Sequence, residues 1–177
     1  MQEYFIREAI TEDREAIGRI IMEVAQQGET FAMEAPANPR AAAADWFSGP
    51  PGRTIVAVDA AGVIHATASM YPNRPAQGAH IASGSLMVAS ASRGKGLGRL
   101  LIRDMIAWAV QEGYRAIQFN AVVETNAAAM RLYESEGFEV LATAPGAFLH
   151  PTRGFVGLAI LWRDLRHPRP PTDSSDA

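Results

Sequence analysis

One long helical pattern stands between two β-prone runs, and this arrangement constrains the fold more than any other feature. Residues 96–111 carry apolar side chains on one side at Leu97, Leu101, Met105 and Trp108, the spacing of an amphipathic helix. The runs 80–88 and 116–123 on either side are rich in strand-forming residues. Two strands joined through a helix lie parallel with a right-handed crossover. The chain is therefore expected to form a sheet in which these two strands run parallel.

The remaining segments extend this pattern to a complete α+β order. Thr11 is predicted to cap a first helix that ends near Gly28, and Asp59–Gly62 forms a tight turn between two antiparallel strands. We predict a mixed central β-sheet flanked by helices, in the order β-α-α-β-β-β-α-β-α-β-β. The other strands are expected at 4–7, 54–58, 63–71, 138–142 and 157–161, and the other helices at 11–28, 40–47 and 126–136.

Composition excludes several classes of protein. The chain has 177 residues, 16 Lys and Arg against 19 Asp and Glu, and therefore a net charge of −3. This acidity disfavours a non-specific nucleic-acid binder, which needs many cations to neutralise phosphates. Cysteine is absent, which excludes disulfides, thiolate metal sites and a cysteine nucleophile.

Length and patterning predict one domain over residues 1–165 and a proline-rich, disordered tail over residues 166–177. The chain has no apolar stretch near the ~20 residues that cross a bilayer, and its first residues are acidic where a signal peptide would be basic. We therefore expect a cytoplasmic protein that binds neither membrane nor nucleic acid.

The segment from Met87 to Leu101 carries the clearest chemical signal. A strand runs into a loop that has glycine at positions 94, 96 and 98, and the long helix follows at once. Glycines allow successive amides to point at one ligand, and a helix N-terminus carries about half a positive charge, so the loop is a candidate phosphate site. Lys95 is followed by glycine rather than Ser or Thr, and the spacing lacks the third glycine of a dinucleotide fingerprint, so neither of those loops fits.

The pattern Arg-x-x-Gly-x-Gly, here Arg93, Gly96 and Gly98, resembles the coenzyme A loop of the GNAT N-acetyltransferases. A second block, Asn126 to Phe138, is similar to the family's Asn…Tyr…Gly-Phe segment, and the predicted order of elements also looks like the GNAT fold. The resemblance spans residues 3 to about 165. It implies acetyl-CoA as the donor, an amine as the acceptor and no metal.

Carried over by position, the resemblance assigns the donor site to the loop and to the strand before it. The main chain of Met87 and Val88 would pair with pantetheine, and its amide would polarise the thioester carbonyl. The pyrophosphate would be held at Arg93, Gly94, Lys95, Gly96, Leu97, Gly98 and Arg99.

Asn126 and Tyr133 are the candidates for the reaction itself. They lie seven residues apart, so on one helix they would differ by about 20° and share a face. In this interpretation Asn126 binds the pantetheine arm and Tyr133 protonates the departing thiolate. The alternative is structural, with Asn126 as a helix cap and Tyr133 as a packing residue.

The general base is harder to predict. Many family members use a carboxylate on the strand before the loop, but residues 80–88 contain neither Asp nor Glu. The candidates elsewhere are Glu124, Glu34, His80 and His150, and an amine of low pKa would need only water.

Acceptor binding is predicted for Asn120, because an asparagine inside a strand needs a polar partner. The run from Phe119 to Asn126 looks like that of GNAT members which acetylate small cyclic amino acids, although Asn120 could equally make a cross-strand hydrogen bond. Phe31, Glu34 and Phe148 would line the acceptor site. The loops that carry these residues could equally be anchored in the fold or form the contact of a homodimer.

The favoured function is direct acetyl transfer from acetyl-CoA to the amine of a small molecule or amino acid. Two alternatives stay open: a non-catalytic acyl-CoA sensor, which the missing strand carboxylate motivates, and an acetyltransferase of a protein or peptide amine.

Overall fold

The computed structural model describes residues 3–167 of the chain. The predicted disordered tail lies outside the described residues from position 168 onward.

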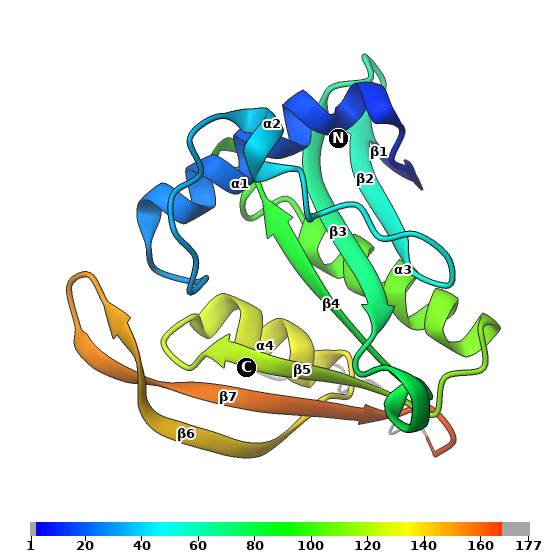
Figure 1. The fold of residues 1–177 in the computed structure, drawn as a ribbon, viewed down its shortest axis with the longest axis vertical. Coiled ribbons are helices and arrows are strands. Elements are labelled where there is room, and N and C mark those ends of the chain that lie inside the picture. The colour runs from blue at the N-terminus through cyan, green and yellow to red at the C-terminus, as the bar shows by residue number, and fades with distance from the viewer. Residues whose placement is uncertain (1–2, 168–177) are drawn as a thin grey trace. The chain divides into compact units, whose positions relative to one another are not determined.

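Within residues 3–167, seven strands and four α-helices follow one another in the predicted order, which confirms the α+β class (Figure 1). The strands are β1 (Tyr4–Glu8), β2 (Arg53–Asp59), β3 (Ile64–Pro72), β4 (Ile81–Val88), β5 (Ala116–Val123), β6 (Glu139–His150) and β7 (Gly154–Asp164). The helices are α1 (Arg14–Gln27), α2 (Pro39–Ala42), α3 (Leu97–Gln111) and α4 (Ala127–Ser135), with short 3₁₀ turns at Thr11–Asp13, Ala76–Gly78 and Ser90–Ser92.

The strands form one mixed sheet in the order β1-β2-β3-β4-β5-β7-β6. The predicted antiparallel hairpin of β2 and β3 is confirmed. The crossover through α3 is confirmed as well, because β4 and β5 pair in parallel at Ile81–Ala116 and Ala82–Ile117. The parallel register is short, while β5–β7 and β6–β7 pair antiparallel over long stretches.

The residues cluster into two compact units. The first comprises Met1–Gln27, Met33–Tyr71 and Gly84–Met105, and the second comprises Gly28–Ala32, Pro72–Ser83 and Ile106–Ala177. Each unit is described by itself below, and a single domain over residues 1–165 stays a prediction.

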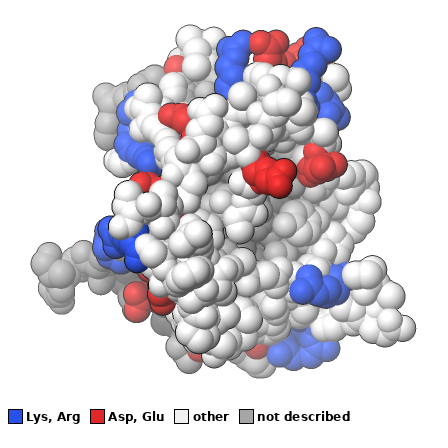
Figure 2. Space-filling model, turned by 60° about the vertical axis from the view of Figure 1, so that its left-hand side comes forward, with Lys and Arg blue, Asp and Glu red and all other residues white. Residues whose placement is uncertain are grey.

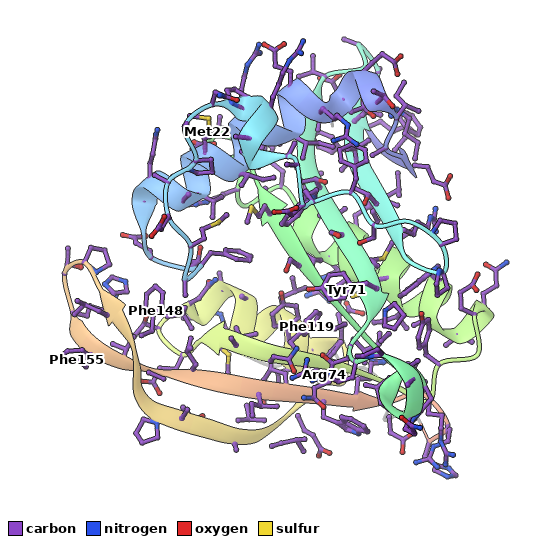
Figure 3. The ribbon with its side chains drawn as sticks, viewed as in Figure 1. Met22, Tyr71, Arg74, Phe119, Phe148 and Phe155 are labelled. Atoms are coloured by element: carbon purple, nitrogen blue, oxygen red, sulfur yellow. The ribbon has the colours of Figure 1, made fainter. Side chains whose placement is uncertain are left out.

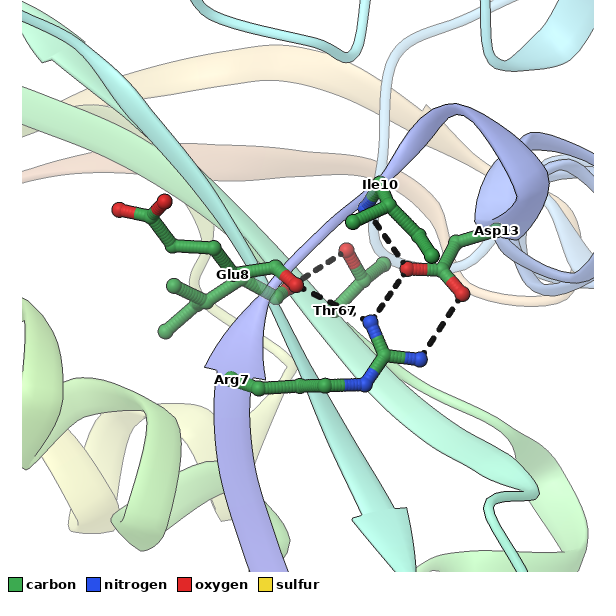
Figure 4. Close-up of polar contacts among 6 residues, drawn as sticks. Arg7, Glu8, Ile10, Asp13 and Thr67 are labelled. Atoms are coloured by element: carbon green, nitrogen blue, oxygen red, sulfur yellow. Dashed lines mark hydrogen bonds and ion pairs between the residues drawn. The ribbon is translucent and has the colours of Figure 1, made fainter.

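The beginning of α1 differs from the prediction at Thr11. Thr11 lies inside a 3₁₀ turn and does not cap the helix, because the N-cap residue is Ile10. The carboxylate of Asp13, three residues further on, accepts the Ile10 amide at 2.8 Å. The Arg7 guanidinium donates two hydrogen bonds to the same carboxylate, at 2.6 and 2.9 Å (Figure 4). The hydrogen bond from Arg7, above all, lowers the pKa of Asp13. The pair therefore stabilises the fold above the unfolded pKa of about 3.9, and this contribution is lost as the pH falls.

Two other predicted boundaries are wrong. The second helix is only four residues long, Pro39–Ala42, with Asn38 as its cap: the Asn38 side chain accepts the Ala41 amide at 2.9 Å. The last two strands are much longer than expected and form the extended hairpin of Figure 1. Residues 139–147 of β6 are exposed on both faces, so their sequence lacks the alternation that reveals a half-buried strand.

Within residues 3–167, no helix is both long enough and apolar enough to cross a membrane.

Candidate active site

The glycine loop is an exposed bridge between two buried anchors. Arg93, Gly94, Lys95 and Gly96 are exposed, while Ser92 before them and Leu97 after them are 3% and 2% exposed. Gly94 and Gly96 have φ angles of 75° and 79°, the left-handed region that favours glycine. These two residues turn the chain sharply into α3, which begins at Leu97.

The start of α3 concentrates positive charge. Leu100 donates to the Gly96 carbonyl at 3.1 Å, so the amides of Leu97 and Gly98 precede the first intrahelical hydrogen bond and point out of the N-terminus. Arg93, Lys95 and Arg99 add cations at the end of the helix dipole that is already positive, an arrangement favourable only with an anion present. Figure 2 shows basic and acidic side chains interspersed on the face that it draws.

The turn before the loop, Ser90–Ser92, is held by polar side chains of α1. The Glu23 carboxylate accepts the Ser90 amide at 3.2 Å, and the Gln27 amide donates to the Ser90 hydroxyl at 2.7 Å. Gln27 also accepts a hydrogen bond from Arg93. Glu23 and Gln27 were not among the predicted site residues. Their i,i+4 spacing beside the apolar stripe of α1 was nevertheless a signal of a shared polar face.

The end of β4, where pantetheine binding is predicted, lies in the same unit as the loop. Met87 is 2% exposed and Val88 is half-buried. The chain is fixed there by a hydrogen bond from the Ala89 amide to the His65 carbonyl, 2.9 Å long. Pairing of this main chain with pantetheine stays a prediction.

Tyr133 belongs to the second unit and lies in an aromatic cluster. Its ring centroid is 4.8 Å from that of Phe119 and 5.7 Å from that of Phe138, and the residue is 9% exposed. Burial raises the pKa of the Tyr133 phenol well above its ordinary value. The hydroxyl therefore keeps its proton at physiological pH, and the same shift makes it a weaker acid than an exposed tyrosine.

Asn126 is a helix cap rather than a helical residue. Its side-chain oxygen accepts the Ala129 amide at 3.2 Å, and its φ and ψ of −78° and 70° are not helical. The predicted helix start at Asn126 is therefore wrong by one residue, because α4 begins at Ala127, and the structure confirms the alternative of Asn126 as a helix cap. The side-chain amide nitrogen of Asn126 is still a donor that a ligand could use.

The candidate bases have identifiable structural roles. The Glu124 carboxylate accepts the Gly157 amide and the Glu124 amide donates to the Gly157 carbonyl, which ties β5 to β7. His150 is 7% exposed, and its Nδ1 accepts the Thr152 amide at 3.2 Å. His80 and Glu34 are exposed.

Asn120 has the polar partners that its place in a strand predicts. Its side-chain amide donates to the Asn73 side-chain oxygen at 2.7 Å and accepts from Gln118 at 2.9 Å. The Arg74 guanidinium donates to the Asn73 carbonyl at 2.9 Å. Arg74 and Phe119, labelled in Figure 3, flank this amide cluster in sequence and belong to the same unit.

The other predicted acceptor residues are divided between the two units. Phe148 is 7% exposed and packs with Val123 and Val156, so its ring is part of the core of the hairpin (Figure 3). Phe31 is half-buried in the second unit, and Glu34 is exposed in the first.

Among residues 3–167, no three histidine or acidic side chains converge as metal ligands would.

Solved structures share this fold. A GCN5-related N-acetyltransferase from Kribbella flavida is 50% identical with a TM-score of 0.88, and the match covers 91% of this chain and 97% of that one. A GNAT superfamily phosphinothricin acetyltransferase from Sinorhizobium meliloti, in complex with acetyl-CoA, is 20% identical with a TM-score of 0.84 and covers 97% and 94% of the two chains. At 20% identity the likeness concerns the fold alone.

A curated relative matches over a shorter stretch. N-acetyltransferase aca1 of Schizosaccharomyces pombe is 36% identical over 67 residues, which are 38% of this chain and 32% of the relative. The chain thus matches about a third or less of the length of the curated relatives.

The model of the acetyltransferase (GNAT) family matches residues 12–138, which include the glycine loop, Asn126 and Tyr133. The chain therefore belongs to the acetyltransferase (GNAT) family.

Proposed function

We propose that the enzyme acetylates the amine of a small molecule or amino acid by direct transfer from acetyl-CoA. The observation that carries the donor half is the exposed loop Arg93–Gly96, with its two left-handed glycines at the cationic start of α3. Backbone amides in this arrangement suit the diphosphate of coenzyme A.

A small acceptor is supported by two observations. The amide cluster of Asn73, Gln118 and Asn120 offers neutral donors and acceptors that suit a polar amino-acid-like molecule. In addition, the structurally similar enzyme from Sinorhizobium meliloti is a phosphinothricin acetyltransferase. A basic peptide would instead favour an extended acidic surface, and the face drawn in Figure 2 has charges of both signs.

The proposed reaction is one acyl transfer. The neutral amine nitrogen attacks the thioester carbonyl carbon, the carbon–sulfur bond breaks, and the thiolate of coenzyme A takes the proton of the Tyr133 hydroxyl. Solvent then returns a proton to the Tyr133 phenolate. The ammonium proton passes to Glu124 or to water, and the Asn126 side-chain amide binds the pantetheine arm. Because the chain has no cysteine, no cysteine acyl-enzyme takes part.

The first test combines binding with turnover. At a concentration a hundredfold above its Kd, acetyl-CoA should stabilise the protein by about 2.7 kcal/mol, which appears as a rise in Tm. Thiol release should then occur with some members of a panel of small amines and amino acids, azetidine and proline analogues included. Acetylation of a peptide array without small-molecule turnover would favour a protein acceptor. Binding without any turnover would favour an acyl-CoA sensor, and no rise in Tm at millimolar acetyl-CoA would contradict the donor site.

A second prediction concerns Gly96. Gly96→Val should weaken acetyl-CoA binding about tenfold or more, because valine is strained at a φ of 79° and the shifted amides lose charge-assisted hydrogen bonds to phosphate. The affinity is measured by isothermal titration calorimetry.

Gly113→Val is the matched control. Gly113 has a φ of 78°, and like Gly96 it has nothing within 4 Å of the position of a Cβ, but it follows the end of α3 at Gln111 and belongs to the second unit. Both variants should lose similar stability, and only Gly96→Val should lose affinity. Equal affinities in the two variants would show that the loop does not bind the diphosphate.

We also propose a homodimer that forms through β6. This strand is at the edge of the sheet, and its side chains Val140, Leu141 and Leu149 are 51%, 54% and 66% exposed. Antiparallel pairing about a two-fold axis would set β6 of one copy beside β6 of the other, with the Glu139 end of each strand next to the His150 end of its partner strand.

Light scattering over a range of concentrations tests the assembly. Wild type should have twice the mass of one chain, Leu141→Lys should be monomeric, and Val63→Lys, at a site 53% exposed in the other unit, should remain dimeric. Monomers of wild type at every concentration would exclude this dimer.

A cytoplasmic location is also proposed, because a chain without cysteine has no part in the disulfide chemistry of oxidising compartments.

A further inference from the structure

Three side chains of the first unit form a hydrogen-bonded relay that ends just before the glycine loop. Asp59 is the last residue of β2, and His65 lies on β3. The distance between Oδ2 of Asp59 and Nε2 of His65 is 3.0 Å. Nδ1 of the same imidazole lies 2.8 Å from the hydroxyl of Ser92. Tyr4 meets the ring edge-on, at 5.3 Å between centroids.

The direction of the hydrogen bonds follows from the carboxylate. A hydrogen bond from His65, above all, lowers the pKa of Asp59, so the group is ionised and can only accept. Asp59 also accepts the Ala61 and Val63 amides, at 3.0 and 2.9 Å, which fixes its side chain in the turn after β2. Nε2 therefore donates to Asp59, and Nδ1 is the nitrogen that forms the hydrogen bond with the Ser92 hydroxyl.

This trio has the composition of a nucleophilic triad but not its exposure. Ser92 is 3% exposed, so its hydroxyl is not available to a substrate. Its position in the chain points to a different use. Ser92 is two residues before Gly94, and the four exposed residues of the loop span the distance from Ser92 to the buried Leu97.

The two anchors of the loop differ in kind. Leu97 is held by burial among apolar side chains, whereas Ser92 is polar, so its fixed place depends on a partner for its hydroxyl. His65 supplies that partner from β3, and it also accepts the Ala89 amide through its carbonyl at 2.9 Å. The strand β3 thus holds both ends of the turn Ser90–Ser92.

We propose that the Asp59–His65–Ser92 relay is a positioning device, which presets the glycine loop for the diphosphate of coenzyme A. The inference rests on the proposed donor site and deepens it, since it names residues that act through the loop without contact with the ligand. Loss of the relay lets the loop sample other conformations, so binding weakens while the reaction of bound substrates proceeds unchanged.

The test separates the two nitrogens of His65. The side-chain amide of asparagine lies near the position of Nδ1 and that of glutamine near the position of Nε2, so His65→Asn can keep the bond to Ser92 and His65→Gln cannot. Ser92→Ala removes the same bond from the other side. Ser92→Ala and His65→Gln should each raise KM for acetyl-CoA about three- to tenfold, which corresponds to the loss of one hydrogen bond. In both variants kcat should stay within about twofold of wild type. His65→Asn keeps the bond to Ser92 and loses the bond to Asp59, so its KM for acetyl-CoA should lie between that of wild type and that of His65→Gln, with kcat within about twofold of wild type.

Ser69→Ala is the control for buried serine. Ser69 is also 3% exposed and lies on β3, but its hydroxyl partner is Ser48, away from the loop. This variant should lose stability with KM unchanged. If wild type binds acetyl-CoA and Ser92→Ala has an unchanged KM, the relay is overturned while the proposed donor site stands. Wild type that binds no acetyl-CoA would overturn the proposed donor site and the relay with it.

Discussion

Tyr133→Phe should lower kcat about a hundredfold or more while KM for acetyl-CoA stays close to that of wild type. General acid catalysis contributes typically about 10²–10⁴-fold, and the substitution removes only the hydroxyl that is proposed to donate the proton. Steady-state kinetics with an acceptor identified by the amine panel measures both constants.

The aromatic cluster makes this a clean substitution. A phenylalanine ring fits the same contacts with Phe119 and Phe138, at 4.8 and 5.7 Å, so the fold should be kept. Because burial raises the pKa of Tyr133, the phenol keeps its proton as the pH rises, and ionisation of this residue should not limit wild type below pH ~10. The unfolded chain loses that proton above pH ~10, so stability should fall there in wild type and fall less in Tyr133→Phe.

Tyr114→Phe is the matched control. Tyr114 is also 9% exposed, packs on Trp108 at 5.0 Å, and has a pKa raised first by burial. It is not a candidate site residue, so its kcat should equal that of wild type. A kcat in Tyr133→Phe that also equals wild type would remove Tyr133 as the acid and leave it a packing residue.

Local patterns predicted most of the fold. The apolar stripe of α3, Leu97, Leu101, Met105 and Trp108, is buried as its spacing indicates, with exposures from 0% to 4%. The spacing of apolar residues changes between strand segments and helix segments, and glycines mark several of the boundaries. This pattern was sufficient to predict the order of elements and the parallel pairing of β4 and β5. These features depend on neighbours in sequence, which is why the sequence reveals them.

Features that depend on distant residues were missed or misassigned. The Asp13 carboxylate accepts the amide of the N-cap residue Ile10 and also pairs with Arg7, and no propensity reports that pairing. Ser92 and His65 are 27 residues apart, and only the folded β3 brings them together. Asn126 shows a third kind of error, since α4 begins one residue later than predicted and Asn126 caps the helix instead of lying within it.

Gly18→Ala should destabilise the protein by about 1–3 kcal/mol, the range for overpacking of a closely packed site, with the upper end expected here. A Cβ at Gly18 would lie 1.9 Å from the Pro39 carbonyl oxygen and 2.5 Å from the carbonyl carbon. Those atoms are backbone at the start of α2, so relief requires α2 to move away from α1 rather than a side chain to rotate. The substitution also gains about 1 kcal/mol of helix propensity, which the displacement must exceed.

Urea unfolding of Gly18→Ala measures this balance through the midpoint and the m-value. The control is Gly49→Ala, at a position where a Cβ meets nothing within 4 Å and the φ is not left-handed, so its stability should match or slightly exceed that of wild type. Gly18→Ala at or above the stability of wild type would mean that the gain in helix propensity exceeds the strain. The close approach of α1 and α2 at Gly18 would then not constrain the fold. A lower midpoint with an unchanged m-value would instead identify Gly18 as the residue whose missing side chain lets the two helices meet.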